Sequence, residues 1–490
     1  MRNRTGFLIA LSLAVFLAGP FSPSSTQAAG SPVQGDRRQL IEGFIEAFNS
    51  GDADRMLSFY EDGATEDFRS RRSDKEDRAL YKRLWDDLGV LNAPKMTSSG
   101  SDSVRLTART DRGDTVTFVI RIAAGPPPQI QGFSVEVGGP PGGGDNPLPP
   151  IDLPGGAELA QLRTSVDRYL RDLADKDLFS GAVLVARGDK ILFEGGYGLA
   201  NREDRIPITT DTRFDIGSIT KEITKAAIGQ LARDGKLSLD DRLIDHVPDY
   251  PDRGVARKIT IAQLVNHSSG LGDLFNERFE NAPKDKMLTP RDFFPIFAEE
   301  PLLFEPGKGN SYSNAGYIVL GAVVEGASGM SYTDYLQKHI FDPAGMADSG
   351  FPLRNGSVPE LAIGYTKQGR GGDGLQRNLG MLPIRGCPAG SSSHTVADLL
   401  RFDRAVRNGK LLGPGWTRWF YTGSVPAAKD LEQPAGFAGG AIGIAGGAPG
   451  VNAMLKSDGS DTVIVLANLD PPIAGRVLGR LQEVFQVADD

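Results

Sequence analysis

The segment FDIGSITK, residues 214–221, places Ser218 three positions before Lys221 at the start of a helical pattern. Apolar residues then recur every four positions as far as Leu231, which predicts a partly buried helix that ends near Gly235. Residues three apart share one face of a helix, so Lys221 can reach the Ser218 oxygen. The free N–H groups at a helix start also favour an oxyanion. Ser218 is therefore either a nucleophile with a cationic or basic neighbour, or an ordinary helix cap.

A second polar motif precedes another apolar helical run, in GKGNSYSNAGYIVLGAVVEGASG, residues 307–329. It contains Tyr312 and, two positions later, Asn314. A tyrosine near a cation can ionise and act as a base, and an asparagine can hydrogen-bond both a lysine and a substrate carbonyl. This motif favours chemistry over simple capping at Ser218.

Together these motifs resemble the serine β-lactamase and penicillin-binding-protein superfamily, in the branch of class C β-lactamases, D-amino-acid peptidases and esterases. The S-x-x-K motif of that branch is similar to residues 218–221, and its Y-x-N motif is similar to residues 312–314. Two flanking phrases also resemble the branch, ITIAQLVNHSSGL at 259–271 and GSSSHTVADLLRF at 390–402. The resemblance covers about residues 157–490.

Carried over residue by residue, the resemblance implies a role for each motif position. Ser218 would be the acylated nucleophile, and Lys221 its cationic or basic neighbour. Tyr312 would be the general base that later activates water, and Asn314 would orient the substrate. The resemblance implies no cofactor. The four histidines of the chain show no metal-ligand spacing, so no metal site is predicted either.

The third motif of this branch, a lysine or histidine followed by x-G, is altered here. The corresponding stretch is GIAGGAPGV, residues 443–451, where Ile444 takes the place of the cation. Gly446 remains as a substrate-binding position. The backbone N–H of Gly447 can still pair with that of Ser218 as an oxyanion hole.

The missing cation leaves two hypotheses open. The first is an exported serine hydrolase that forms an acyl-enzyme on Ser218, with weak activity or a preference for neutral ester, amide or peptide substrates, including cell-wall fragments. The second is a catalytically silent protein that keeps the fold and binds a cell-wall or small-molecule ligand. The intact Ser218 and Tyr312 motifs favour the first hypothesis, and Ile444 favours the second.

Composition divides the chain into four segments. Residues 1–28 combine two arginines with a short apolar run and small residues, which indicates a signal peptide and a secreted or periplasmic protein without a membrane span after its removal. The Gly/Pro-rich residues 138–156 predict a linker between domains at 36–137 and 157–490. The net charge of -8 argues against nucleic-acid binding. The single cysteine, Cys387, excludes an intramolecular disulfide.

Both domains are predicted to be α+β. In the first, FIEAFNSGDADRMLSFYED at 44–62 resembles the opening of ketosteroid-isomerase-like cone folds, with helices first and a curved antiparallel sheet afterwards. An accessory role or dimerisation is expected of it. In the second, strands at both ends are expected to join in one antiparallel sheet, flanked by helices and by a mainly helical subdomain at about 215–430.

Overall fold

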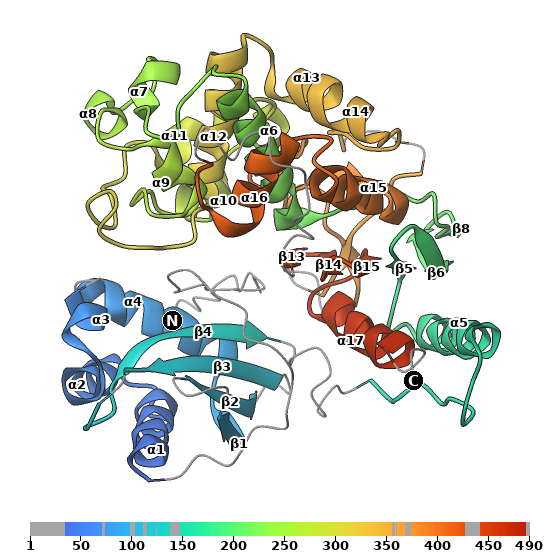
Figure 1. Ribbon diagram of the computed structural model, residues 1–490, viewed down its shortest axis with the longest axis horizontal. Coiled ribbons are helices and arrows are strands. Elements are labelled where there is room, and N and C mark those ends of the chain that lie inside the picture. The colour runs from blue at the N-terminus through green and yellow to red at the C-terminus, as the bar shows by residue number, and fades with distance from the viewer. Residues whose placement is uncertain are drawn as a thin grey trace, which may run out of the picture.

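The chain folds into two units with separate hydrophobic cores (Figure 1). The computed structural model describes residues 35–70, 74–98, 103–110, 115–123, 125–137, 148–354, 358, 360–367, 374–426 and 442–486. The predicted signal peptide, residues 1–28, lies outside the described residues, as do residues 138–147 of the predicted linker.

The first unit has its helices before its strands, in the order expected from the sequence. The elements are α1 (Asp36–Asn49), α2 (Ala53–Gly63), α3 (Glu66–Ser70), α4 (Asp74–Leu88), β1 (Leu91–Ser98), β2 (Ser103–Thr110), β3 (Thr115–Ile122) and β4 (Ile130–Val137). The strands form an antiparallel sheet in sequence order. Phe44 of α1 packs edge to face against Phe118 and Phe133 of the sheet, so aromatic side chains fill the interior.

The second unit is built on a five-stranded antiparallel sheet in the order β13-β14-β15-β5-β6. Its strands are β5 (Gly181–Arg187), β6 (Lys190–Tyr197), β13 (Ile442–Ala448), β14 (Val451–Ser457) and β15 (Asp461–Ala467). Strands β5 and β15 pair along their whole length, from Gly181 opposite Ala467 to Arg187 opposite Asp461. The two ends of this unit therefore meet in one sheet, which confirms the predicted α+β class.

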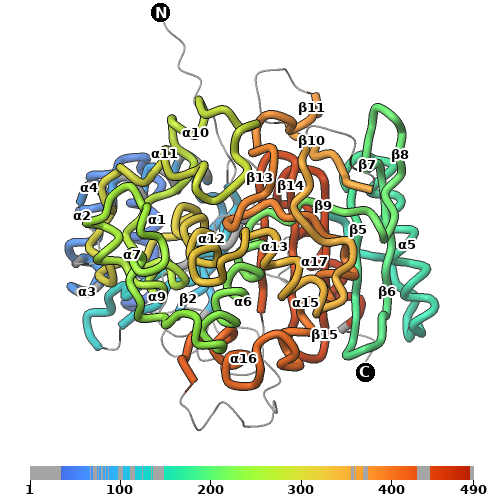
Figure 2. Tube along the Cα trace, turned by 90° about the horizontal axis from the view of Figure 1, so that it is seen from above, coloured from blue at the N-terminus to red at the C-terminus, as the bar shows by residue number. Residues whose placement is uncertain are grey.

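Helices cover both faces of this sheet (Figure 1). On one face lie α5 (Leu159–Asp175) and α17 (Ile473–Gln486), whose buried leucines and valines pack against the sheet. On the other face lie α15 (Val396–Arg407), α6 (Thr220–Arg233) and the helical subdomain. Viewed from above, that subdomain occupies the side of the unit away from β5 and β6 (Figure 2).

The helical subdomain is made of short helices around two long ones, α6 and α12. Its other elements are η1 (Gly217–Ile219), α7 (Leu243–His246), α8 (Arg253–Ala256), α9 (Ile261–Val265), α10 (Glu277–Asn281), η2 (Lys284–Lys286), η3 (Pro290–Phe293), α11 (Phe294–Phe297), α13 (Tyr332–Leu336), η4 (Gln337–Phe341), α14 (Asp342–Ala344) and α16 (Gly413–Thr422). Helix α12 (Asn314–Ser328) is apolar on every side and buried over most of its length, which explains its place at the centre. Within the described residues, no helix is both long and apolar enough to cross a membrane.

Short strand pairs connect the subdomain to the sheet. They are β7 (Leu199–Asn201) with β8 (Ile206–Pro207), β9 (Phe214–Asp215) with β12 (Ser393–His394), and β10 (Tyr365–Thr366) with β11 (Gln376–Arg377). The β9–β12 pair leads directly into the segment that carries Ser218.

A buried chain of polar side chains ties the start of α6 to α15. Thr220 Oγ1 lies 2.8 Å from Ser392 Oγ, which lies 2.8 Å from His394 Nε2. On its other side, His394 Nδ1 lies 2.7 Å from Ser349 Oγ, which donates to Asp398. Each side chain of this series thus has a hydrogen-bond partner, and the first turn of α6 is held in place.

The second unit begins before residue 157. Leu148 is buried, and its carbonyl accepts a hydrogen bond of 2.6 Å from Arg480 Nη2 of α17. The carbonyl of Pro149 accepts one of 3.0 Å from the Tyr169 hydroxyl of α5. The C-terminal part of the predicted linker is therefore packed on the second core.

We expect limited proteolysis to cut within residues 138–147, because GGPPGGGDNP offers no apolar pattern that could join either core. The two fragments should then fold independently, as judged by circular dichroism and cooperative unfolding of each. Protection of this segment, together with failure of either fragment to fold alone, would contradict the division into two domains.

Because the ring of His394 is buried, we expect the folded protein to lose stability in mild acid. Burial, and secondarily the charge of Arg213, lowers the pKa of His394 from 6.5 to about 3. Between these two values the unfolded chain binds a proton that the folded chain does not, so the free energy of unfolding falls as the pH drops. The expected slope from this residue is at most about 1.4 kcal/mol per pH unit.

Denaturation of the wild type and of His394→Gln at several pH values measures this contribution. Glutamine keeps hydrogen-bonding atoms but cannot take up the proton, so the variant should lose stability less steeply below about pH 6.5. Equal slopes for the two proteins would exclude His394 as the source.

Candidate active site

The segment that carries Ser218 is fixed from both sides. Strand β9 ends at Asp215, whose carboxylate accepts a 2.8 Å hydrogen bond from Gly217 N and pairs with Arg354. Gly217 has a φ of +52°, a conformation that suits glycine. Ser218 follows in the 3₁₀ turn η1, immediately before α6. The serine therefore lies at a helix start, as the sequence predicts.

The structure brings together the side chains of the two intact motifs. The Oγ atom of Ser218 lies 3.1 Å from Lys221 Nζ and 2.8 Å from the Tyr312 hydroxyl. Lys221 is only 4% exposed and donates further hydrogen bonds to Asn314 Oδ1, at 2.7 Å, and to the carbonyl of Ala389. The serine oxygen thus has two groups within reach that can exchange its proton.

Helix α12 positions Asn314 through a cap and a carboxylate. Ser313 is the N-cap, and its Oγ accepts from Gly316 N at 2.9 Å. The amide nitrogen of Asn314 donates to Asp273 Oδ1 at 2.7 Å. Since the Asn314 oxygen is held by Lys221, both ends of this amide are fixed. Sequence reasoning missed Asp273, although it lies just after the phrase at 259–271.

His267, one of the four histidines whose spacing predicts no metal site, lies against Tyr312. The two ring centroids are 4.8 Å apart, and His267 Nδ1 accepts a hydrogen bond from Ser313 N. Burial, followed by the charges of Lys221 and Lys225, lowers the pKa of His267 to about 3. The ring is therefore neutral at physiological pH and supports the tyrosine without adding charge.

Strand β13 comes close to the nucleophile because its facing residues are glycines. A Cβ atom on Gly446 would lie 1.9 Å from the carbonyl oxygen of Ile216 and 3.0 Å from Ser218 N. A Cβ atom on Gly217 would lie 2.8 Å from Gly447 N. The backbone N–H groups of Ser218 and Gly447 thus belong to two segments in direct contact, the arrangement that an oxyanion hole requires.

The altered third motif is packed with apolar groups. Ile444 adjoins the large hydrophobic core and borders a small cavity with Ile219, Phe402 and Phe420. A lysine or histidine at this position would place its charge mostly among apolar side chains, beside an Asp403 that is already paired with Arg407. Position 444 therefore contributes packing to the site and no charge.

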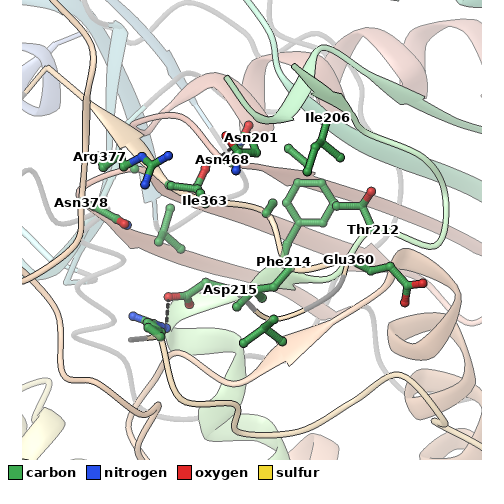
Figure 3. A pocket seen from close by; sticks show the side chains of 18 of the residues that line it. Asn201, Ile206, Thr212, Phe214, Asp215, Glu360, Ile363, Arg377, Asn378 and Asn468 are labelled. Atoms are coloured by element: carbon green, nitrogen blue, oxygen red, sulfur yellow. Dashed lines mark hydrogen bonds and ion pairs between the residues drawn. The ribbon is translucent and has the colours of Figure 1, made fainter. Parts of the chain in front are cut away.

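A larger cavity, of about 750 Å³, is lined in part by both residues of β9 (Figure 3). Phe214, Asn378 and Asn468 line it, and the Asp215–Arg354 ion pair is drawn at its edge as a dashed line. Ser218, Lys221 and Tyr312 are not among the residues that line it. This cavity therefore adjoins the segment that carries the nucleophile without containing the reactive groups.

Comparison with known proteins connects this geometry to a family. The family model named Beta-lactamase matches residues 166–486. Penicillin-binding protein 4* of Bacillus subtilis (strain 168) is 32% identical over 255 residues, which cover 50% of this chain and 56% of the relative. The chain thus spans little more than half the length of that curated relative.

Two solved structures share the fold of the second unit. The penicillin binding protein from Bacillus halodurans aligns with a TM-score of 0.57 at 30% identity, over 64% of this chain and 100% of that chain. The D-amino acid amidase from Ochrobactrum anthropi SV3 has a TM-score of 0.54 at 23% identity, over 67% of this chain and 99% of that chain.

The family match extends from α5 to α17 and includes every residue of the site described above. It does not extend to the first unit, whose cone-fold resemblance stays a prediction. This chain therefore belongs to the beta-lactamase family, within the superfamily of serine β-lactamases and penicillin-binding proteins.

Proposed function

We propose that this protein is an exported hydrolase that cleaves small ester, amide or peptide substrates through an acyl-enzyme on Ser218. The observation that carries the proposal is the contact of one serine oxygen with both Lys221 Nζ, at 3.1 Å, and the Tyr312 hydroxyl, at 2.8 Å. A helix-capping serine needs neither group. A nucleophile needs at least one of them to remove its proton.

In the first half of the reaction, Ser218 Oγ attacks the substrate carbonyl carbon while its proton passes to the Tyr312 oxygen, which acts as the general base. The positive charge of Lys221 stabilises the negative charge that moves between these oxygens. The carbonyl oxygen becomes an oxyanion and accepts hydrogen bonds from the backbone N–H groups of Ser218 and Gly447. The tetrahedral species then expels the alcohol or amine, which takes the proton from Tyr312.

In the second half, water attacks the acyl-enzyme. Tyr312 removes a proton from this water, and the oxyanion forms again between the same two N–H groups. Collapse releases the carboxylic acid, and the proton held by Tyr312 returns to Ser218. The free hydrogen of the Asn314 amide can meanwhile donate to the substrate, because Asp273 occupies only one side of that nitrogen.

The family and the names of its relatives support this proposed substrate class. One structural neighbour is a D-amino acid amidase complexed with L-phenylalanine amide, and another is a D-stereospecific amidohydrolase from Streptomyces sp.. Curated relatives are penicillin-binding proteins. These names support amides and peptides, including cell-wall fragments, as substrates. Export to the periplasm or the medium rests on the signal-peptide pattern of residues 1–28.

A silent binding protein remains the second candidate, because Ile444 removes the cation that the resemblance leads us to expect. In that case the cleft would bind its ligand without forming a covalent bond. The two candidates differ in one measurable event, the acylation of Ser218.

We expect a fluorophosphonate probe, or a panel of activated esters and β-lactams, to leave a covalent adduct on the peptide that contains Ser218. Ser218→Ala should abolish the mass increase, whereas Ser268→Ala, which changes a serine in the neighbouring loop, should keep it. A folded wild type that is never labelled and hydrolyses none of the panel, yet binds ligand in the cleft, would establish the silent protein instead.

The two partners of Ser218 should each control the labelling rate. Lys221→Ala and Tyr312→Phe are expected to slow labelling by about 10²- to 10⁴-fold, as happens when a base is removed from a nucleophile. Tyr250→Phe is the matched control, since the buried Tyr250 hydroxyl has no hydrogen-bond partner among the described residues. Stopped-flow or mass-spectrometric time courses measure the rates. Unchanged labelling in Tyr312→Phe would remove this tyrosine from the mechanism.

A further inference from the structure

The cleft in front of Ser218 combines an apolar wall with one charged residue. Ser218, Asn314 and Gly447 contribute the polar part of its lining. The apolar wall consists of Leu274, Phe275, Phe279, Leu382 and Pro383. Arg385 is the one lining residue that carries a formal charge, and no aspartate or glutamate lines the cleft among the described residues. The cleft therefore has a positive charge that no carboxylate in its lining neutralises.

The side chain of Arg385 has no partner in the part of the chain that the structure describes. Its Nε atom is buried and makes no hydrogen bond, and its guanidinium forms no ion pair. Arg354 shows the opposite arrangement, because it is paired with Asp215. A guanidinium offers five N–H donors in a planar fork. Leaving a partly buried cation unpaired costs free energy, so this position suits an anion that arrives with a ligand.

The neighbouring cation cannot take this role. The ammonium group of Lys221 has three hydrogens, and Ser218, Asn314 and Ala389 accept them. Position 444 is an isoleucine packed against the hydrophobic core. Arg385 is therefore the charged group of the cleft that is still available to a ligand.

We propose that Arg385 binds a carboxylate of the substrate, so that the preferred substrates are esters or amides with a carboxylate beside an apolar group. The guanidinium and a carboxylate match in a two-pronged hydrogen-bonded pair, and the apolar group lies against the wall formed by Leu274, Phe275 and Phe279. This assigns a substrate class to the hydrolase proposed above and rests on that function. It also replaces the preference for neutral substrates that the loss of the cation at Ile444 predicts.

The same segment borders a second cavity, of about 310 Å³, on the far side of Arg385 and Cys387. Two carboxylates, Glu325 and Asp334, line that cavity. Glu325 is already paired with Arg291. Rotation of Arg385 toward Asp334 would withdraw its charge from the cleft, and the protein would then bind carboxylate and neutral ligands equally well.

The test compares two ligands of equal size, 3-(butanoyloxy)benzoate and its neutral carboxamide. Binding is first measured by calorimetry with Ser218→Ala, which cannot be acylated, so the result does not depend on catalysis. We expect this protein to bind the carboxylate at least about tenfold more tightly, and Arg385→Met in the same background to lower that preference by about 10- to 100-fold, the range for a hydrogen-bonded charge. Hydrolysis of the same pair by wild type and Arg385→Met should show the same fall in the ratio of kcat/KM.

Two control variants distinguish the loss of the Arg385 charge from a loss of folding. Arg385→Lys keeps the positive charge but lacks the planar guanidinium, so this variant should retain part of the preference for the carboxylate. It replaces Arg385→Met in the test if that variant does not fold. Arg257→Met removes a surface arginine that does not line the cleft and should leave the preference unchanged. Equal binding of the two ligands by Ser218→Ala, or a preference that survives Arg385→Met, overturns the proposal. Selective binding without any hydrolysis by the wild type supports Arg385 and rejects the hydrolase.

Discussion

The buried ammonium group of Lys221 is the contact on which the rest of the site depends. Removing an ammonium group from water costs several kcal/mol unless it is paired or fully hydrogen-bonded. Here its three hydrogens are directed to Ser218 Oγ, to Asn314 Oδ1 and to the carbonyl of Ala389, which belong to η1, to α12 and to the segment before β12. Since no hydrogen is left over, these three parts of the fold have to meet at one point. The geometry of the serine is therefore a consequence of satisfying one buried cation.

The close approach of β13 to the nucleophile explains why this strand contributes no charged side chain to the cleft. Because residues 446 and 447 are glycines, the strand can contact residues 216–218. For the same reason, it has no side chain at these two positions. Ile444, two residues earlier, faces the hydrophobic core. The strand can thus supply backbone N–H groups to an oxyanion but no charge. The segment that supplies the Ala389 carbonyl also carries Arg385, so the cation that lines the cleft comes from this segment and not from β13.

The parts of the site that depend on side-chain identity and local spacing could be predicted from the sequence. Ser218 with Lys221, and Tyr312 with Asn314, are short motifs at helix starts, and alternating strands at both ends of the second unit predicted its sheet. The Ala389 carbonyl could not be predicted, because a backbone acceptor has no sequence signature. Arg385 was missed for a related reason: an arginine in a loop becomes informative only when the cleft that it lines is known to lack a carboxylate, as this one does among the described residues. The packing of Leu148 against α17 was hidden by the Gly/Pro-rich composition around it.

The first unit has a hydrophobic core of its own, and this limits what the unit can contribute to the function of the protein. Every group assigned to the reaction lies between β9 and β13 of the second unit, so the chemistry requires no side chain from residues 36–137. Within the first unit, Phe44, Phe48, Phe118 and Phe133 are at most 2% exposed and pack against one another. Opening a ligand cavity among them would forfeit close aromatic packing that stabilises this small core. A function of this unit is therefore better served by its outer surface than by its interior, and the accessory or dimerisation role stays a prediction from the sequence.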